Sequence, residues 1–379
     1  MIRAVFSGVF PQCAQKSRRG SRGARLDVST GGMAKMRAFL VTTAKNEAPY
    51  FLEWVAHHLE LGFTDIVIFQ NDSDDLTHET LFALRKIGAI RYFYNRAENR
   101  QIKTQAYTRA DSFPEFKDCD WAMALDMNEF LVVKTGNGTL TDLIAAVPES
   151  DCLHLNRRDF GNSGFELLTD ELVTDRFCMA DHPLGPTENA SPYKCLFRPS
   201  LFQRPGIHHP EKPVIAPEAI RYTNGSGLRP DHYRVKSILS TDICGCEFAQ
   251  INHYITRDLT SFLLKSTENS DMKADRRTVL RHWKKRNKNF EIDGSMAPWQ
   301  ARTIARMNAL DEASDGQLME LRQTAIYTHL SRYYTMLQKP AMRDFRDRCK
   351  AHPNAVNPHT DHAISSPPDL TGLAEMYLK

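Results

Sequence analysis

An acidic motif directly follows the fourth apolar run of the chain. Asp126, Asn128 and Glu129 come after the core-like residues 121–125, and apolar residues resume at Phe130. Carboxylates beside a buried strand are costly unless a partner neutralises them. A Mg²⁺ or Mn²⁺ ion that also holds a diphosphate is such a partner, because both ions prefer oxygen ligands and share them with phosphates. The motif therefore predicts a metal-assisted site at a departing phosphate group. Taken alone, a solvated turn is the simpler explanation.

A second polar cluster follows the first apolar run, residues 37–42. Lys45, Asn46 and Glu47 lie where this expected strand ends and a helix begins. Backbone N–H groups at a helix start attract anions, so Asn46 and Glu47 are candidates for nucleoside binding. Asn and Glu also suit a helix start as capping residues, which explains the trio without any ligand.

A third cluster follows the second expected strand, residues 65–69. Asn71, Ser73 and Asp75 could hold a ribose or a base there. An Asx-type turn leading into a helix is the alternative, because Asn, Ser and Asp bond readily to the nearby backbone.

Strands and helices alternate through the first part of the chain, with short connections. The expected strands are residues 37–42, 65–69, 89–94 and 121–125, and the expected helices are residues 47–61, 77–87 and 101–116. This alternation predicts a parallel, doubly wound α/β sheet. Ligands of such sheets bind at the carboxyl ends of the strands, where all three polar clusters fall.

We expect five segments along the 379 residues. They are a basic N-terminal extension over 1–35, an α/β half over 36–150, a second half of the same domain over 151–300, C-terminal helices over 301–340, and a poorly ordered tail over 341–379. The extension holds seven Lys or Arg and one Asp, which is typical of a transit peptide or a disordered tail. Translation from Met33 or Met36 is the other explanation.

Composition excludes several classes of protein. The formal net charge of +3 is too small to indicate nucleic-acid binding by itself. No run of about 18 apolar residues is present to span a membrane. The eight cysteines include no CxxC pair, so a zinc ribbon or finger is not expected, and reduced thiols indicate a cytoplasmic protein.

A strongly basic helix is expected over residues 273–288. Its eight Lys and Arg residues cover much of a helix surface above Val279, Leu280 and Trp283. A solvated face is the favoured interpretation. Weak contact with the anionic inner face of a membrane is the alternative.

Taken in order, these motifs resemble those of glycosyltransferase family 2 and the related family 92-like transferases. The similarity covers roughly residues 37–300. Its pieces are Lys45-Asn46-Glu47, Asn71-x-Ser73-x-Asp75, Asp126-x-Asn128-Glu129-Phe130, the FG-x-S-G-like loop 160–164, Arg176-Phe177, Lys194, Gly206-Ile207-His208, Asn252-His253-Tyr254, Arg257, Phe262, Lys265, Asn287-x-Asn289 and Asp293.

The resemblance implies a GT-A fold, a Rossmann-like and mostly parallel sheet with helices on both faces and a helical C-terminal part. It assigns nucleotide-sugar binding to the half over 36–150 and the acceptor side to the half over 151–300. It also implies transfer of a sugar from a nucleotide-diphospho-sugar donor to a hydroxyl of a glycan or other acceptor, with Mn²⁺ or Mg²⁺ as cofactor. We expect an inverting reaction in cell-surface or extracellular polysaccharide synthesis.

The resemblance also suggests roles for individual residues. Asp126, Asn128 and Glu129 would hold the metal, with His208 and His253 as later contacts to metal or diphosphate. Lys194 and Lys265 would balance phosphate charge. Asp159 is the first candidate for the general base and Glu211 the second.

One departure from the family motif keeps other functions open. The family usually has Asp where this chain has Asn128, and an amide brings no charge to a metal. A catalytically inactive relative that binds glycans or nucleotides is therefore one alternative. A nucleotidyltransferase is another, although residues 42–48 lack the glycine-rich loop usual in that class.

Overall fold

The computed structural model describes residues 36–96, 101–183, 190–229, 238–240, 244–268 and 276–351. The expected basic extension, residues 1–35, lies outside the described residues, as does most of the expected tail. The described residues belong to one compact unit that begins at Met36. Among them, no helix is both long and apolar enough to cross a bilayer.

The first half of the fold is the predicted parallel sheet. Its strands are β1 (Ala38–Ala44), β2 (Asp65–Gln70), β3 (Arg91–Tyr94) and β4 (Trp121–Ala124), in the spatial order β3-β2-β1-β4. Its helices are α1 (Phe51–Leu61), α2 (Thr77–Lys86), α3 (Ile102–Ala110) and α4 (Pro114–Lys117). All three strand pairs are parallel, as the alternating pattern predicts. One expected helix, residues 101–116, is two helices, because the residue before Pro114 is disfavoured in helical conformation.

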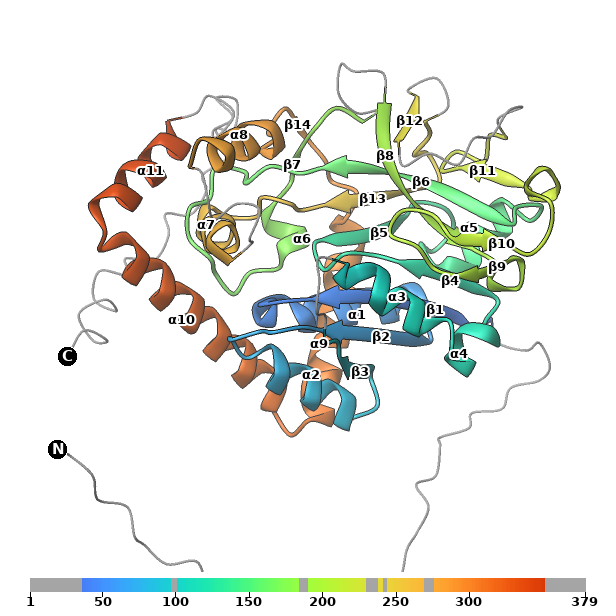
Figure 1. The fold of residues 1–379 in the computed structure, drawn as a ribbon, viewed down its shortest axis with the longest axis horizontal. Coiled ribbons are helices and arrows are strands. Elements are labelled where there is room, and N and C mark those ends of the chain that lie inside the picture. Colours follow the sequence, from blue (N-terminus) through green and yellow to red (C-terminus); the bar gives the residue numbers. More distant parts are fainter. Residues whose placement is uncertain are drawn as a thin grey trace, which may run out of the picture. The chain divides into compact units, whose positions relative to one another are not determined.

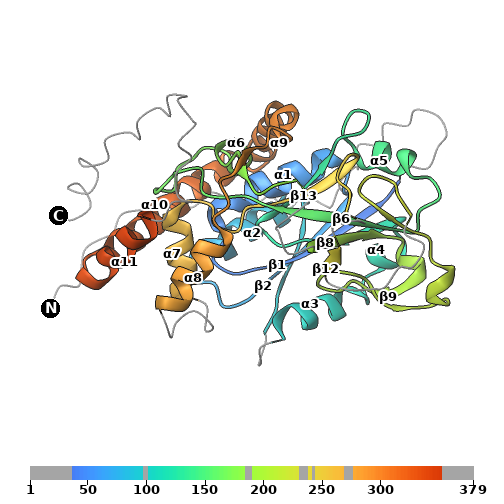
Figure 2. The ribbon, with the colours of Figure 1, turned by 90° about the horizontal axis from the view of Figure 1, so that it is seen from above.

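The helices cover both faces of this sheet, as predicted. In β1, Ala38 and Leu40 pack in a buried cluster with residues of α1 and α2. Phe39 and Val41 point the other way, into a cluster with residues of α3. Figure 2 shows α1 and α3 on opposite sides of β1 and β2. The α/β fold class is thereby confirmed.

The second half extends the same sheet in a mixed fashion. Its main strands are β8 (Ala190–Phe197), β6 (Cys152–Asp159), β13 (Ala249–His253) and β5 (Glu129–Val133). Beyond β4 the spatial order is β8-β6-β13-β5, with β8 antiparallel to β4 and to β6. Shorter strands are β7 (Met179–Ala180), β9 (Phe202–Arg204), β10 (Glu211–Pro213), β11 (Tyr222–Asn224), β12 (Ile238–Ser240) and β14 (Glu291–Ile292).

The sheet cannot be flat, because β4 and β5 are consecutive in sequence but separated by three strands. The link from Ala124 to Glu129 can span at most roughly 18 Å. Four strand spacings in a flat sheet would take about 19 Å. The turn carrying Asp126 and Asn128 therefore joins the two ends of a curled sheet, and Figure 1 shows β5 lying between β13 and α1.

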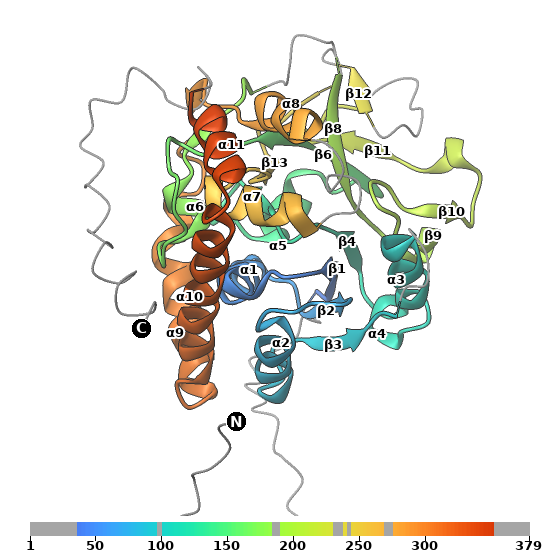
Figure 3. The same cartoon turned by 60° about the vertical axis from the view of Figure 1, so that its left-hand side comes forward.

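Helices form the C-terminal part. They are α7 (Leu259–Glu268), α8 (Arg276–Arg286), α9 (Gln300–Ala313), α10 (Gln317–Leu337) and α11 (Pro340–Lys350), with the short α5 (Leu140–Ala146) and α6 (Val173–Arg176) earlier in the chain. The long α10 runs beside α2 and α7 (Figure 3). A buried cluster joins α7, α8, α10 and α11 through Trp283, Tyr333 and Phe345.

The start of the expected disordered tail is corrected by α11. Residues 340–350 are helical, with Pro340 in the first turn, where it costs no hydrogen bond. Phe345 and Cys349 are buried against α8, and Trp283 Nε1 donates to the Cys349 carbonyl at 3.0 Å. The polar composition around Pro353 and Pro358 hid this apolar stripe. Residues 352–379 lie outside the described residues.

Candidate active site

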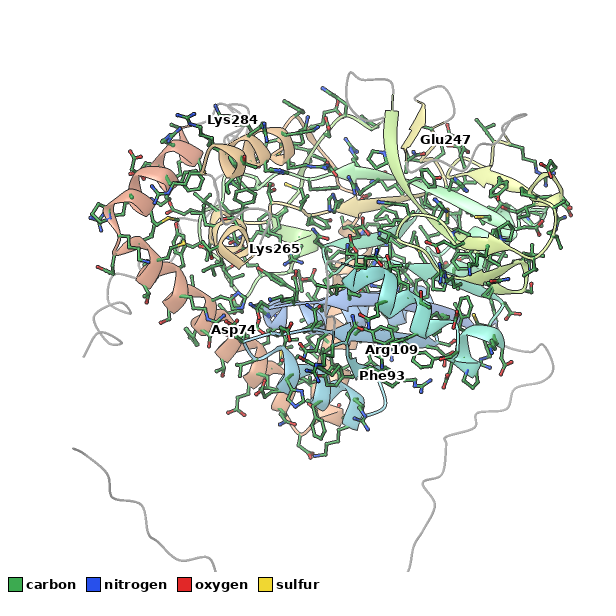
Figure 4. The ribbon with its side chains drawn as sticks, in the orientation of Figure 1. Asp74, Phe93, Arg109, Glu247, Lys265 and Lys284 are labelled. Atoms are coloured by element: carbon green, nitrogen blue, oxygen red, sulfur yellow. The ribbon has the colours of Figure 1, made fainter. Side chains whose placement is uncertain are left out.

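A cleft of about 610 Å³ opens at the carboxyl ends of β1 and β2 and at the turn after β4. This is where a doubly wound sheet binds its ligands. Its lining comprises Thr43, Ala44, Lys45, Glu47, Asn71, Gln101, Ile102, Lys103, Thr104, Asp126, Met127, Asn128, Arg157, Ile207, His253, Ile255, Phe262, Lys265, His282 and Arg286. Figure 4 shows Lys265 on α7, which closes one side of this region.

Asp126 is the carboxylate at the centre of the cleft. Its Oδ1 lies 2.6 Å from Lys103 Nζ and 3.8 Å from Lys194 Nζ. Burial by itself raises the pKa of Asp126, but the two lysines overcome it and hold the pKa far below its usual range. Asp126 is therefore ionised at neutral pH. Both ion pairs use Oδ1, which leaves Oδ2 for a ligand.

Glu129 stabilises the turn that carries Asp126 from within the protein and does not line the cleft. Its side chain is completely buried, and Oε2 accepts the backbone N–H of Asp126 at 2.9 Å. Lys194, also buried, lies 3.2 Å from Oε2 and donates to the Ile207 carbonyl at 2.8 Å. Arg157 NH1 lies 3.7 Å from Oε1. Glu129 and Lys194 thus fix the backbone that presents Asp126, which differs from the direct ligand roles expected of them.

Asn128, His253 and Asp159 form a hydrogen-bonded chain. Asp159 Oδ1 lies 2.7 Å from His253 Nδ1, and Asn128 Nδ2 lies 3.3 Å from His253 Nε2. An ionised carboxylate only accepts, so Nδ1 carries the proton and Nε2 presents its lone pair toward Asn128. Burial lowers the pKa of His253, which keeps the ring neutral. A carboxylate behind a histidine is the arrangement that orients metal-binding imidazoles.

Asp159 is fully engaged and does not line the cleft. Besides His253, it pairs with Arg157 Nε at 3.2 Å and Arg286 NH1 at 2.9 Å. Burial raises its pKa, but His253, Arg157 and Arg286 together hold the pKa far below its usual range. Such a carboxylate is a weak proton acceptor, because a general base works best with a pKa near the operating pH.

The other predicted base, Glu211, lies on β10 outside the cleft lining. Its Oε2 pairs with Arg204 at 2.8 Å from Nε and 2.7 Å from NH2. Burial, the largest effect, and the charge of Lys194 lower the pKa of His208, while Glu129 and Asp126 act in the opposite direction. Its Nδ1 is buried and makes no hydrogen bond, yet the ring is absent from the cleft lining.

Glu47 forms ion pairs with two cations that come much later in the chain. Oε2 lies 2.7 Å from Arg257 NH1, and Oε1 lies 2.7 Å from Lys265 Nζ. Burial raises the pKa of Glu47, but these cations lower it by more. Glu47 and Lys265 both line the cleft, as predicted for the donor site, and their contact ties β1 to α7.

The remaining predicted donor residues fall into two groups. Asn71 lines the cleft. Asn46, Ser73 and Asp75 instead hold the loops together: Asn46 Oδ1 accepts from Asp74 N at 2.9 Å, and Ser73 Oγ accepts from Asn46 N at 3.2 Å.

The Asp75 side chain is buried and accepts from two backbone N–H groups, those of Ala48 and Thr77. Its Oδ1 accepts from Thr77 N at 2.8 Å, and Oδ2 lies 2.9 Å from His329 Nε2 on α10. These contacts fit the alternative of a polar turn over 71–75, whereas no side-chain cap is formed at the start of α1 or α2. Asn46 also has a positive φ of 53°, a conformation that Asn tolerates better than most residues.

Sequence reasoning missed several basic side chains of the cleft. Lys103, Arg157 and His282 line it but belong to none of the motifs, and Arg286 entered only as part of the basic helix. A positive cleft wall suits a diphosphate, yet single cations on a helix or strand carry no local pattern that marks them. The helix start at residues 101–104 facing the acidic turn was the available signal.

The donor atoms at the turn fit a divalent cation. Asp126 offers a carboxylate oxygen, Asn128 an amide oxygen, and His253 an oriented Nε2 lone pair. Oxygen donors with an imidazole suit Mn²⁺ or Mg²⁺ shared with substrate phosphates. The buried Glu129 and the outlying His208 do not join this set.

The sequence that forms this sheet and cleft matches a known protein family. The family model of glycosyltransferase family 92 matches residues 42–294, about two-thirds of the chain and nearly all of the sheet. The chain belongs to glycosyltransferase family 92. The family 92 part of the resemblance is confirmed, whereas family 2 is a different family and is not the one matched. The match spans the motifs from Asn46 to Asp293, so a glycosyltransferase domain is present as predicted.

Similar proteins agree with this family. A glycosyltransferase family 92 protein of Oryza sativa subsp. japonica is 26% identical over 200 residues, which are 51% of this chain and 32% of that protein. The chain therefore matches about a third of that relative's length.

Solved structures are only distantly similar. S. aureus TarS 1–349 in complex with UDP-GlcNAc is 13% identical, covers 80% of this chain and 92% of its own, and has a TM-score of 0.28. HddC from Yersinia pseudotuberculosis is 8% identical, covers 44% of this chain and 78% of its own, and has a TM-score of 0.26. Scores this low carry no argument about function.

Proposed function

We propose that the cleft transfers a sugar from a nucleotide-diphospho-sugar to an acceptor hydroxyl. The observation that carries this proposal is the Asp126–Asn128 turn at the carboxyl edge of the sheet, which shares its cleft with cations from several elements of the fold. Lys45, Lys103, Arg157, Lys265 and Arg286 line the same cleft. This surplus of positive charge suits a diphosphate, which bears several negative charges.

Asp126, Asn128 and His253 would hold a Mn²⁺ or Mg²⁺ ion, which would supply Lewis-acid stabilisation of the leaving diphosphate. The chain's own residues share that task. Lys103, already 2.6 Å from Asp126, would contact the diphosphate when the donor is bound. Glu129 and Lys194 hold the turn in place, and Asp159 holds His253 in the neutral tautomer that presents Nε2.

The nucleoside would lie over the ends of β1 and β2. Ala44, Lys45 and Asn71 line the cleft there, and backbone and amide groups suit a base and a ribose. Glu47 is neutralised by Arg257 and Lys265, so its charge does not repel the phosphates.

One observation supports a single displacement with inversion. Among the described lining residues, the carboxylates are Glu47 and Asp126. Glu47 is held by Arg257 and Lys265, and the free oxygen of Asp126 is assigned to the metal, so neither is expected to act as a nucleophile on the sugar. Asp159 would act as a positioning residue for His253 rather than as the base, because its three cationic partners weaken its basicity.

The test is a panel of nucleotide sugars with Mn²⁺, read by donor hydrolysis and by thermal stabilisation. A true donor raises the melting temperature by mass action and releases nucleoside diphosphate. Stabilisation without turnover on any acceptor would favour the inactive binding relative. Release of pyrophosphate from a nucleoside triphosphate and a sugar phosphate would favour a nucleotidyltransferase. We further propose that the reaction belongs to polysaccharide synthesis on the cytoplasmic side of the cell membrane.

A further inference from the structure

A second group of metal-binding side chains lies inside the sheet, away from the cleft. Cys152 and His154 project from the same face of β6, since they are two residues apart along a strand. Cys195 lies directly opposite His154 on the antiparallel strand β8. One ligand atom from each residue lies within 4.8 Å of the other two.

All three side chains are shielded from solvent. Cys152 is 0% exposed, His154 is 2% exposed and Cys195 is 3% exposed. The imidazole is fixed in orientation, because it stacks on Tyr193 at 4.5 Å between ring centroids and meets Tyr222 edge-on at 5.3 Å. Cys152 Sγ lies 3.6 Å from His154 Nε2, so a thiol and an imidazole nitrogen already face each other.

We propose that Cys152, His154 and Cys195 form a structural binding site for a thiophilic d¹⁰ metal ion, with Zn²⁺ as the probe. Two thiolates and a neutral imidazole are the donors that zinc prefers in structural sites.

Cys244 lies beside the next position on this face of β6, where its Sγ accepts from Asn156 Nδ2 at 3.3 Å, but it is not part of the group whose ligand atoms lie within 4.8 Å of one another. The site is closed to solvent and lies apart from the lining of the cleft, so its role is to join strands. It would hold β6 to β8 in the middle of the sheet.

The ion would be taken up as the strands pair, because the folded site is buried. Binding replaces two thiol protons by one metal ion and releases those protons to solvent. No oxidant or reductant is needed. The proposal does not depend on the proposed transferase function.

The first test measures metal content in the whole chain. Wild-type protein from zinc-supplemented growth, desalted before assay, should carry about one zinc ion per chain. Cys152→Ser and Cys195→Ser should lose most of it. Cys119→Ser is the matched control, because Cys119 is a buried thiol in the same apolar cluster but lies outside the trio. Asp126→Ala should keep the zinc, which separates this site from the cleft.

A spectroscopic test covers variants that fail to fold. Wild-type protein is unfolded with a chelator and refolded with Co²⁺, and thiolate-to-cobalt charge transfer is read in the near ultraviolet. A band in the wild type and in Cys119→Ser supports the proposal. A zinc-free wild type without this band would overturn it, and so would equal zinc content in wild type and Cys195→Ser. Either result would leave the trio as ordinary packed thiols and an imidazole.

Discussion

Asp126 combines the strongest electrostatic contacts with the most central position in the cleft. Replacing it with Ala should lower turnover by about 10²- to 10³-fold, the usual cost of removing one electrostatic contributor to a transition state. The melting temperature should fall as well, because the ion pairs of ionised Asp126 stabilise the folded chain and the buried Lys194 would lose one of its carboxylate partners. Steady-state kinetics and a thermal melt measure the two effects.

Asp118→Ala provides the matched control, since Asp118 is an exposed aspartate just before β4. It should leave both turnover and stability unchanged. Near-normal turnover in Asp126→Ala would remove Asp126 from the site.

Asn128 is the residue at which this chain departs from the family motif. Asn128→Asp should lower the Mn²⁺ concentration for half-maximal activity several-fold, because a carboxylate adds charge beside the cation. His253 Nε2, 3.3 Å from the present amide, would face that carboxylate and favour protonation at low pH. The gain should therefore shrink as the pH falls. A higher Mn²⁺ requirement at neutral pH would exclude Asn128 as a ligand.

At this scale the sequence predicted the acidic turn and the lining residues Glu47, Asn71, Lys265 and His253. It could not separate Asp126 from Glu129, because burial depends on which way a turn faces. It also missed Lys103, whose position opposite Asp126 depends on how α3 packs over the sheet.

The helix α8 is the element whose role remains a prediction. Arg281, Lys284 and Lys285 are exposed, and Figure 4 shows Lys284 at the outer side of the helix. His282 and Arg286 face the cleft instead. Any membrane contact through the outer face would therefore bring lipid near the mouth of the cleft.

Replacing Arg276, Arg281, Lys284 and Lys285 with Gln tests this. If they hold the protein at anionic lipid, each contributes about 1 kcal/mol, so binding should fall roughly several hundredfold at low salt. We expect a solvated face, and hence weak binding that the variant changes little. Sedimentation with vesicles, with and without anionic lipid, measures it. Strong, salt-sensitive binding that the variant loses would contradict this expectation.

The elements before residue 125 could be predicted because each strand and helix has its own periodic pattern. The later strands could not be ordered, since β8 enters beside β4 from about 70 residues further along the chain. Long-range pairing leaves no local pattern. The helix α11 was missed because its apolar stripe consists of few residues within a polar segment.

At the scale of the whole molecule, buried carboxylates should make stability sensitive to acid. Ion pairs and hydrogen bonds lower the pKa of six of them despite burial, which by itself raises it; these are Glu47, Asp75, Asp126, Asp151, Asp159 and Asp293. Each contributes stability at neutral pH, because the unfolded chain binds its proton more readily. That contribution is lost as the pH falls below the unfolded values of 4.5 for Glu and 3.8 for Asp.

Two other buried carboxylates act in the opposite direction. Burial raises the pKa of Glu53 and Asp258, so their protonation favours the folded state as the pH falls. The six outnumber the two, and the melting temperature should therefore drop steeply below about pH 4.5. Thermal melts from pH 7 to pH 3 measure this. A flat profile would show that the ion pairs are not formed in solution.

The curled sheet also sets an order of events during synthesis. The turn with Asp126 joins β4 to β5, but β5 pairs with β13, which comes much later in the chain. Likewise, Glu47 forms its ion pair with Arg257, which is synthesised 210 residues later. A nascent chain that has emerged only to residue 150 thus has its acidic motif but no partner strand for β5. Nucleotide-sugar binding should appear only after α7 leaves the ribosome, so a half-made chain cannot trap donor molecules.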